Sequence, residues 1–381
     1  MTELQQCTEL LTQLVACPSV NPNRQKILGP PFGEERLVSL LDDLLRSWGA
    51  RTRVADVAPG RPNFIATFAG KDERRSLMLE AHSDTVDADR MMAAPFEPAI
   101  RDGRLYGRGA CDAKGAMAAM LMAIKSVLEK DGRPPITLHF VSCADEERGA
   151  NGARRLMEDG FRADGCVVGE PTEMKIICAH KGAVRTRITT EGVAAHSSEP
   201  SRGVNAIHKM VAVLQSLENI VQPELDKINH PLLGKPTLSV GTIQGGTQVN
   251  VVPAACTIEV DRRLVPGETR ESAVRQIMDA LKFQTGLSCE EIEYYPPLEQ
   301  SSTSPLARQV ESACRRELGH AEFAVAAWAS DAGVFAAAGI PSVLFGPGSV
   351  LRAHTQEEYV ELDEVVAACR VYADIIRQSG S

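Results

Sequence analysis

Short apolar strands alternate with helical stretches along much of the 381-residue chain, and this alternation limits the fold more than any other feature. Four runs have the length and the β-branched, apolar composition of buried strands: SLMLEAH (76–82), PITLHFVSCA (135–144), GCVVGE (165–170) and IPSVLFG (340–346). Helical spacing is present in KGAMAAMLMAIKSVLEK (114–130) and DEVVAACRVYADIIRQ (363–378). The alternation predicts an α/β domain in which helices cover both faces of a central sheet.

A different order of elements occupies the middle of the chain. Its strand patterns are AVRTRITTE (183–191), TLSVGTI (237–243), AACTIEVDR (254–262) and SCEEIEY (288–294). Its helix patterns carry Val204, Ile207, Val211 and Leu214 in the first helix and Val274, Ile277 and Leu281 in the second. The resulting β-α-β-β-α-β order is that of ferredoxin-like domains. We therefore expect a larger domain formed by residues 1–179 and 299–381, into which residues 180–298 are inserted as a smaller domain.

Composition and charge exclude several classes of protein. The formal net charge of -9 argues against nucleic acid or an anionic membrane as the main partner, because both attract clustered Lys and Arg. The first 20 residues have the pattern of an amphipathic helix rather than a signal peptide, and the apolar run 116–124 is too short to span a bilayer. The ten cysteines form no Cys-x-x-Cys pair, which favours reduced thiols in the cytoplasm.

Histidine and acidic residues follow several of the predicted strands. They are His82 and Asp84 after the first strand, Asp112 just before a helix, Glu146 and Glu147 after the second strand, Glu170 after the third and His354 beyond the fourth. Each of them alone is ordinarily a turn or surface residue. The carboxyl ends of strands in an open α/β sheet are nevertheless where ligands bind, so these side chains are expected to converge. Converging acids repel one another, and a divalent cation is the usual compensation.

The charge of this cluster indicates how many cations it holds. If the carboxylates of Asp112, Glu147 and Glu170 act beside neutral His82 and His354, the protein supplies three negative charges. Two divalent ions and a shared hydroxide neutralise them, which predicts a two-metal site with ions roughly 3.5 to 4 Å apart. Mixed imidazole and carboxylate ligands favour zinc, with cobalt or manganese as alternatives.

Eight motifs, in order along the chain, carry a family resemblance: EAHSDTV, GRGACDAKG, DEERG, GEPT, AAHSSEPSRGVNAI, GGTQVNVVP, DRRLVPG and GPGSVLRAHTQEEYV. From about residue 8 to residue 375, the chain resembles the metallopeptidase-related family that includes acetylornithine deacetylase, succinyl-diaminopimelate desuccinylase, aminoacylase and bacterial glutamate carboxypeptidase. The acetylornithine deacetylases are the most similar branch. The resemblance implies a zinc-peptidase-like catalytic domain with a central mixed sheet, and an inserted ferredoxin-like α+β domain that acts as a lid and in dimerisation.

The resemblance also implies roles for the polar cluster. It assigns one metal to His82, Asp112 and Glu170 and the other to Asp112, Glu147 and His354, so that Asp112 bridges the two ions. Asp84 is implied as the carboxylate that orients His82, and Glu146 as the general base. Asp87 has no implied role and is interpreted as a solvated turn acid, while Ala113 stands where the family often has a second acid.

Further roles fall on the inserted domain and on one glycine loop. The resemblance implies that His196 stabilises the oxyanion in the active site of the neighbouring subunit of a homodimer. It implies that Arg263 binds the substrate carboxylate through two parallel hydrogen bonds. Asn250, Gly346 and Gly348 are implied as further substrate contacts. Arg262 is interpreted as a solvated charge at the end of a strand.

The expected activity is metal-assisted hydrolysis of the amide bond of a small N-acyl-α-amino acid. AHKG (179–182) and HSSEP (196–200) favour an N-acetylornithine deacetylase of arginine biosynthesis, because the desuccinylases tend to have RRGS and HVAYP there. The alternatives within the family are a desuccinylase, an aminoacylase or a small-peptide carboxypeptidase.

Three other classes of protein are alternatives to an amidohydrolase. A dinucleotide fold is disfavoured because Asp112 takes the sixth position of the Gly107-x-Gly109 pattern. A serine hydrolase is disfavoured because no Gly-x-Ser-x-Gly follows a strand. A non-catalytic metal-binding or ligand-binding protein on the same fold stays open, although the chain retains Glu146 and every implied ligand.

Overall fold

The computed structural model describes residues 1–23, 25, 27 and 29–380. The chain divides into two compact units. Residues 1–178, 300–324 and 330–381 form the first unit, and residues 179–299 and 325–329 form the second. All ten cysteines are free thiols. Within the described residues, no helix combines the length and the apolar character that crossing a membrane would require.

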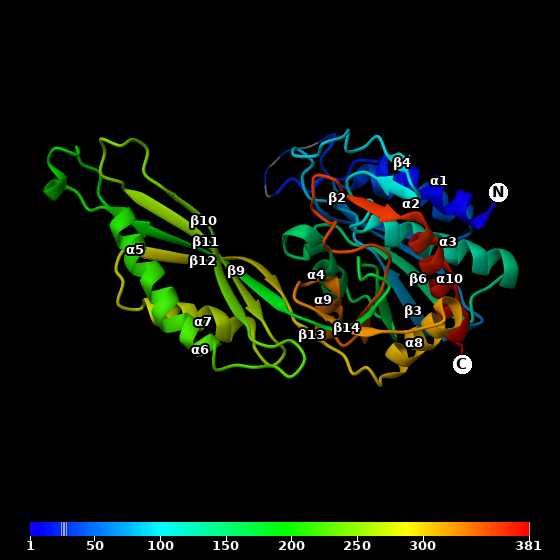
Figure 1. The fold of residues 1–381 in the computed structure, drawn as a ribbon. Helices are drawn as coiled ribbons and strands as arrows, with labels where there is room; N and C mark the ends of the chain where they lie inside the picture. The colour runs from blue at the N-terminus through cyan, green and yellow to red at the C-terminus, as the bar shows by residue number, and fades with distance from the viewer. Residues whose placement is uncertain (24, 26, 28, 381) are drawn as a thin grey trace. The chain divides into compact units, whose positions relative to one another are not determined.

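A nine-stranded mixed sheet forms the centre of the α/β fold (Figure 1). Its strands are β1 Arg51–Ala58, β2 Arg61–Phe68, β3 Asp72–Glu80, β6 Ile136–Ser142, β7 Cys166–Val168, β8 Ile176–His180, β13 Leu298–Glu299, β14 Phe323–Ala326 and β15 Ser342–Leu344. The order is β1-β2-β6-β3-β7-β15-β8-β13, and β14 pairs with β8. Strands β6, β3, β7 and β15 run parallel, whereas β1, β2 and β8 pair antiparallel with their neighbours. The predicted α/β class with a mixed central sheet is confirmed.

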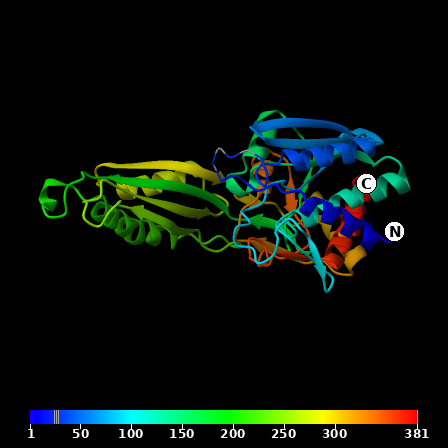
Figure 2. The same cartoon turned by 90° about the horizontal axis from the view of Figure 1, so that it is seen from above.

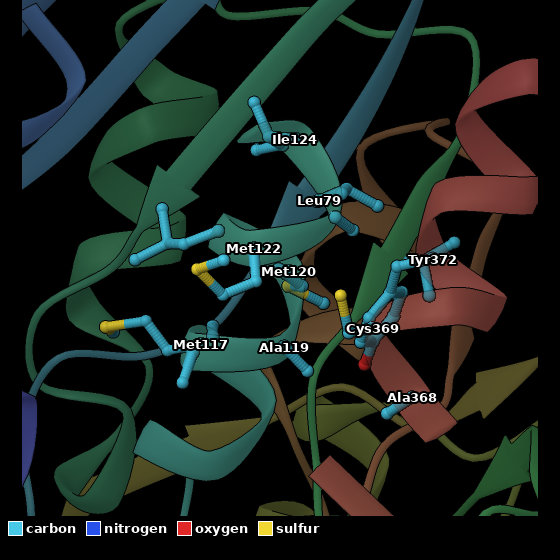
Figure 3. Close-up of a cluster of buried hydrophobic side chains, with 14 of the residues drawn as sticks. Leu79, Met117, Ala119, Met120, Met122, Ile124, Ala368, Cys369 and Tyr372 are labelled. Carbon is cyan, nitrogen blue, oxygen red and sulfur yellow. The ribbon is translucent and has the colours of Figure 1, made fainter. Parts of the chain in front are cut away.

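Helices pack around this sheet through small and flexible apolar side chains. The first unit contains α1 Glu3–Val15, α2 Glu35–Ser47, α3 Lys114–Asp131, α4 Asn151–Glu158, α8 Pro305–Leu318, α9 Asp331–Ala337 and α10 Leu362–Gln378. Figure 3 shows the cluster in which Ala119 and Met120 of α3 meet Cys369 and Tyr372 of α10 beside Leu79 of β3. Full burial of a side chain such as Leu79 contributes roughly 1.5 to 3 kcal/mol. This packing fixes α3 against β3 and α10, and so fixes the end of the loop that leads into α3.

Strand direction decides where the loops of the first unit meet. Because β3, β6 and β7 are parallel, their carboxyl ends lie at the same edge of the sheet. A separate three-stranded sheet joins β4 Ala99–Arg101, β5 Arg104–Tyr106 and β16 Tyr359–Glu361. The pairing of β16 with β5 connects the segment after residue 345 to the segment that leads into α3.

The second unit is a four-stranded antiparallel sheet with helices on one face (Figure 2). Its elements are β9 Gly182–Glu191, α5 Ala206–Ser216, α6 Gln222–Leu225, β10 Thr237–Gly245, β11 Ala255–Leu264, α7 Arg270–Leu281 and β12 Leu287–Tyr295. The sheet order β10-β11-β9-β12 and the two crossover helices are those of a ferredoxin-like domain.

Two interpretations of this unit need correction. Val204 precedes α5, and Ile207 and Val211 are exposed, because the helix instead turns Ala206, Met210 and Val213 toward the sheet. The apolar spacing located the helix, but of the four spaced residues only Leu214 packs against this core.

Arg262 is fully buried rather than solvated. Alternate residues of β11 face the core, and Arg262 lies on the same face as Val260 and Leu264. Its guanidinium group is therefore paired, with the carboxylate of Glu268 and with the amide oxygen of Gln276 at 3.3 Å.

Candidate active site

Five side chains of the first unit form two adjoining ligand groups. One group is His82, Asp112 and Glu170, and the other is Asp112, Glu147 and His354; within each group the ligand atoms lie within 4.8 Å of one another. Asp112 belongs to both groups. Its Oδ1 lies 2.9 Å from Nε2 of His82, and its Oδ2 lies 3.2 Å from Nε2 of His354. Each oxygen of this carboxylate therefore faces a different histidine, as a carboxylate that bridges two ions requires.

The fold brings these residues together from distant parts of the sequence. His82 follows β3, Glu147 lies in a short 3-10 turn after β6, and Glu170 follows β7. Asp112 lies in the loop before α3, and His354 lies in the loop between β15 and β16. Nε2 of His354 also lies 3.0 Å from Oε1 of Glu147, which links these two loops.

Electrostatics indicate a site made for cations. Burial raises the pKa of Glu170 well above its usual value, and the neighbouring Asp112 raises it further. Burial lowers the pKa of His354, but hydrogen bonds with Asp112 and Glu147 outweigh it and raise the pKa to about 11. Burial raises the pKa of Asp112, yet its bonds to the two histidines bring it below the usual value. Without metal, protons on the histidines compensate the acids, and a divalent ion replaces them when it binds. The nitrogen and oxygen donors of both groups fit zinc or a similar ion.

Asp84 contacts this site in two ways. Its backbone carbonyl oxygen lies 2.9 Å from Nδ1 of His82, whereas its carboxylate Oδ1 lies 3.6 Å from the same nitrogen. The carboxylate accepts hydrogen bonds from the backbone N–H groups of Glu146, at 3.0 Å, and Glu147, at 3.2 Å. Asp84 thus contacts His82 mainly through its backbone, and its side chain anchors the turn that carries Glu146 and Glu147.

Glu146 is the adjacent acid that belongs to neither ligand group. Only 8% of the surface of Glu146 is exposed to solvent. Burial raises its pKa well above the usual value, and the charge of Glu170 adds to the shift. A buried carboxylate with a raised pKa is a better proton acceptor than a solvated one.

A buried network behind the turn was missed by sequence reasoning. Arg61 pairs with Glu34 and Asp145, and the side-chain amide of Asn21 donates to Asp84 at 2.7 Å and to Asp145 at 2.8 Å. Burial raises the pKa of Glu34 to about 7, although Arg61 opposes the shift. These residues lie far apart in sequence, so no local pattern marks them. The network holds Asp84 and the start of the Asp145–Glu147 turn in place.

Glu358 was also missed, although it lies within one of the family motifs. Its buried carboxylate accepts hydrogen bonds from the backbone N–H groups of Gly109 at 3.0 Å, Cys111 at 2.9 Å and Asp112 at 3.0 Å. It also accepts one from Arg108 at 2.6 Å. One acid therefore shapes the loop that presents Asp112. Its position next to Glu357 gave it the local pattern of a surface acid.

The glycines implied as substrate contacts have packing roles. Gly346 donates to Oγ1 of Thr172 at 3.0 Å, and a Cβ atom there would lie 2.6 Å from the carbonyl oxygen of Glu170. Gly348 has a positive φ of 86°, and its N–H donates to Glu364 at 2.7 Å. Substrate contact by either residue stays a prediction.

His196, Asn250 and Arg263 belong to the second unit, whereas all the ligand-group residues belong to the first. His196 is exposed and its Nδ1 lies 2.7 Å from Oγ of Ser198. Arg263 forms a bidentate pair with Asp261 at 2.7 and 3.1 Å. The role of each of these three residues stays a prediction.

A pocket of about 770 Å³ opens beside the second ligand group. Glu147 and His354 contribute to its wall, together with Asp87, Asp89 and Arg90. Asp87 is exposed, as expected for a solvated turn acid, but its position gives it access to a molecule in this pocket.

The chain is similar to one family of peptidases and to acetylornithine deacetylases. The model of peptidase family M20/M25/M40 matches residues 78–378. The chain is 32% identical over 392 aligned residues to the acetylornithine deacetylase of Edwardsiella ictaluri, covering 98% of each protein. It is 31% identical over 351 residues to the acetylornithine deacetylase of Vibrio cholerae, covering 89% of this chain and 90% of that one.

Solved structures show the same fold at lower identity. The M20 family metallo-carboxypeptidase Sso-CP2 from Sulfolobus solfataricus has a TM-score of 0.82 at 18% identity, over 98% of this chain and 99% of that one. The YXEP protein of Bacillus subtilis, a dinuclear metal-binding peptidase of family M20, has a TM-score of 0.70 at 16% identity, over 98% of both chains.

Proposed function

Because the chain belongs to peptidase family M20/M25/M40, we propose that it is a di-metal amidohydrolase that removes the acyl group from a small N-acyl-α-amino acid, first of all N-acetylornithine. That it is a metal-dependent hydrolase follows from the family and from the two ligand groups. The observation that carries the di-metal assignment is Asp112, whose two oxygens face two different histidines.

We propose separate roles in metal binding and proton transfer for the side chains of the site. We assign one metal to His82, Asp112 and Glu170 and the other to Asp112, Glu147 and His354, with zinc as the first choice and cobalt or manganese as alternatives. When bound, the two ions polarise the acyl carbonyl group and lower the pKa of the attacking water. Glu146 accepts a proton from that water and passes it to the leaving amine as the C–N bond breaks.

We further propose a homodimer in which His196 of one subunit donates a hydrogen bond to the oxyanion in the active site of the other. An unpaired edge supports this part of the proposal, because β10 is the outer strand of its sheet and carries the exposed Ile243. The exposed Ile207 and Val211 of α5 add apolar surface to the same unit. The second unit would then act as a lid and in dimerisation.

The proposed substrate has an α-carboxylate and a side-chain ammonium group. Arg263 is the proposed partner of the carboxylate, which would take the place of Asp261 as the acceptor of its two parallel donors. Asp87 and Asp89 in the pocket beside Glu147 are the proposed partners of the ammonium group, although Arg90, Arg108 and Arg148 also line this pocket. The deacetylase relatives support the same choice, and such an enzyme would act in the cytoplasm in arginine biosynthesis.

A substrate screen tests the proposal. Protein reconstituted with zinc or cobalt is offered N-acetyl-L-ornithine, N-succinyl-diaminopimelate, neutral N-acetyl amino acids and dipeptides, and kcat/KM is compared. We expect N-acetyl-L-ornithine to give the highest value, and we expect a chelator to abolish activity that added metal restores. A preference for the succinyl substrate would move the enzyme to the desuccinylases.

A non-catalytic role is tested in the same screen. If metal-loaded protein hydrolyses none of these amides, the binding-protein alternative replaces the proposal. Glu146→Gln serves as the control, because it should retain the metals and lose turnover.

A further inference from the structure

A third cluster of metal-ligating side chains lies in the core of the first unit, apart from the two active-site groups. Glu80 is the last residue of β3, Cys143 is the first residue after β6, and Asp331 is the first residue of α9. Their ligand atoms lie within 4.8 Å of one another. All three side chains are buried, with exposures of 1%, 0% and 0%. The cluster shares no residue with either active-site group.

Several oxygens of this cluster have no partner within the described part of the chain. Neither Oδ1 nor Oδ2 of Asp331 forms a hydrogen bond, and Oε1 of Glu80 forms none either. The charges of His82 and Arg154 act on Asp331, but neither of its oxygens receives a hydrogen bond. A buried carboxylate oxygen without a hydrogen bond is costly, so such an atom ordinarily has a ligand. Two carboxyl groups that share a proton lie roughly 2.5 to 2.7 Å apart. Neither oxygen of Asp331 has a hydrogen-bond partner, so neither can share a proton with Glu80.

We propose that Glu80, Cys143 and Asp331 form a third metal site, which takes a zinc-like divalent ion. A cysteine sulfur with two carboxylates is a donor set that zinc accepts, whereas calcium and magnesium require oxygen ligands. Zinc–sulfur bonds are about 2.3 Å and zinc–oxygen bonds about 2.0 to 2.2 Å long. Atoms that lie within 4.8 Å of one another can therefore surround one ion after small side-chain adjustments. The thiol releases its proton when the ion binds.

The position of the site indicates what the ion does. The proposed site connects the ends of β3 and β6 with the start of α9. Two segments of the active site follow it directly in the sequence. Glu80 is two residues from His82, and Cys143 is three residues from Glu146. The ion would thus be structural, and the proposal does not depend on which amide the enzyme hydrolyses.

Cobalt spectroscopy separates this site from the active site. The two active-site groups contain no cysteine, so a near-ultraviolet thiolate-to-cobalt charge-transfer band reports only on a site that contains a thiol. We expect the wild-type protein loaded with Co²⁺ to show the band and Cys143→Ser to lack it. Cys178→Ser is the matched control, because Cys178 is also buried but belongs to no ligand group, and it should retain the band. A wild type without the band, or a Cys143→Ser variant that keeps it, would overturn the proposal.

Metal content and anomalous diffraction provide the second test. By elemental analysis, Asp331→Asn should contain about one metal equivalent per chain less than wild type, because an amide oxygen is a weaker ligand than a carboxylate. If a variant does not fold, wild-type crystals still decide the matter. An anomalous peak at the zinc edge among the three side chains supports the site, and its absence from zinc-loaded crystals rejects it.

Discussion

Adjacent acids can have different functions when their backbone is held in a defined turn. Both oxygens of the Asp84 carboxylate are engaged, one by the N–H of Glu146 and the other by that of Glu147. The side chain of Glu147 then reaches His354, whereas Glu146 stays in the buried interior beside Glu170. At the scale of single residues, the turn thus separates the proposed metal ligand Glu147 from the proposed proton acceptor Glu146.

This separation predicts different results for two conservative substitutions. Glu146→Gln should keep both metals and lower kcat by about 10² to 10⁴, because the amide cannot accept a proton. Glu147→Gln should lose or weaken one metal, since it removes a ligand charge. Elemental analysis and steady-state kinetics on the same preparations measure both effects. Equal metal contents in the two variants would contradict the assigned roles.

A second residue-scale prediction concerns His139 on β6. Burial lowers the pKa of this histidine to about 4, and the charge of Arg51 adds to the shift. Because the pKa is depressed relative to the unfolded chain, the neutral histidine favours the folded state above about pH 6.5, and this contribution is lost as the pH falls toward 4.

Between pH 7 and pH 5, we expect His139 to cost the wild type roughly 1 to 2 kcal/mol of unfolding free energy. His139→Gln, which does not titrate, should lose less stability over the same interval. Urea unfolding of both proteins with a chelator present measures the difference. Parallel pH profiles would show that the histidine titrates equally in both states.

At the scale of elements, the site depends on loops that are fixed by contacts with other segments. The loop before α3 has its N–H groups held by Glu358, which lies just before β16. The turn after β6 is held by Asp84 from the loop after β3. Parallel strands bring the loop ends to one edge of the sheet, but these long-range hydrogen bonds set their conformation.

Glu358 gives an element-scale prediction with a matched neighbour. Glu358→Ala leaves the guanidinium group of Arg108 and three backbone N–H groups without their buried acceptor, so we expect it to cost about 3 to 5 kcal/mol and to weaken metal binding. The exposed Glu357→Ala should change stability by less than about 0.5 kcal/mol. Denaturant unfolding and zinc titration compare the two. Similar effects would remove Glu358 from its role in shaping the loop.

At the scale of the whole molecule, the proposed catalytic residues are divided between two compact units. The proposed metal ligands and Glu146 belong to the first unit, and His196 belongs to the second. A dimer in which the second unit serves the partner subunit would explain why an enzyme of this kind needs a separate ferredoxin-like domain.

Mixing two inactive variants tests this arrangement. His196→Ala and Glu146→Gln should each be inactive as homodimers. After subunit exchange, a heterodimer has one site with both wild-type residues, so about a quarter of wild-type activity should return at equal mixing. Exchange is verified by mass spectrometry of the native dimers. Demonstrated exchange without recovered activity would place His196 in its own subunit's site or outside catalysis.

The sequence by itself determined the element order, the α/β class and the family, because strand and helix periodicities are local and the motifs are contiguous. Its prediction that His82, Asp112, Glu147, Glu170 and His354 converge also corresponds to the geometry, since parallel strands carry their ends to one edge.

Only the tertiary structure decided which buried polar groups form hydrogen bonds or ion pairs with one another, and which apolar side chains form the core. Sequence patterns did not indicate the buried pairing of Arg262, the true core face of α5 or the partners of Glu358. Nor did they show that Glu80, Cys143 and Asp331 meet, since these residues come from three separate elements. Periodicity in the sequence indicates only whether a position is expected to be buried or exposed. The partners of a buried side chain, near or far in the sequence, depend on how the elements pack, and a buried charge is stabilised only by the neighbours that packing provides.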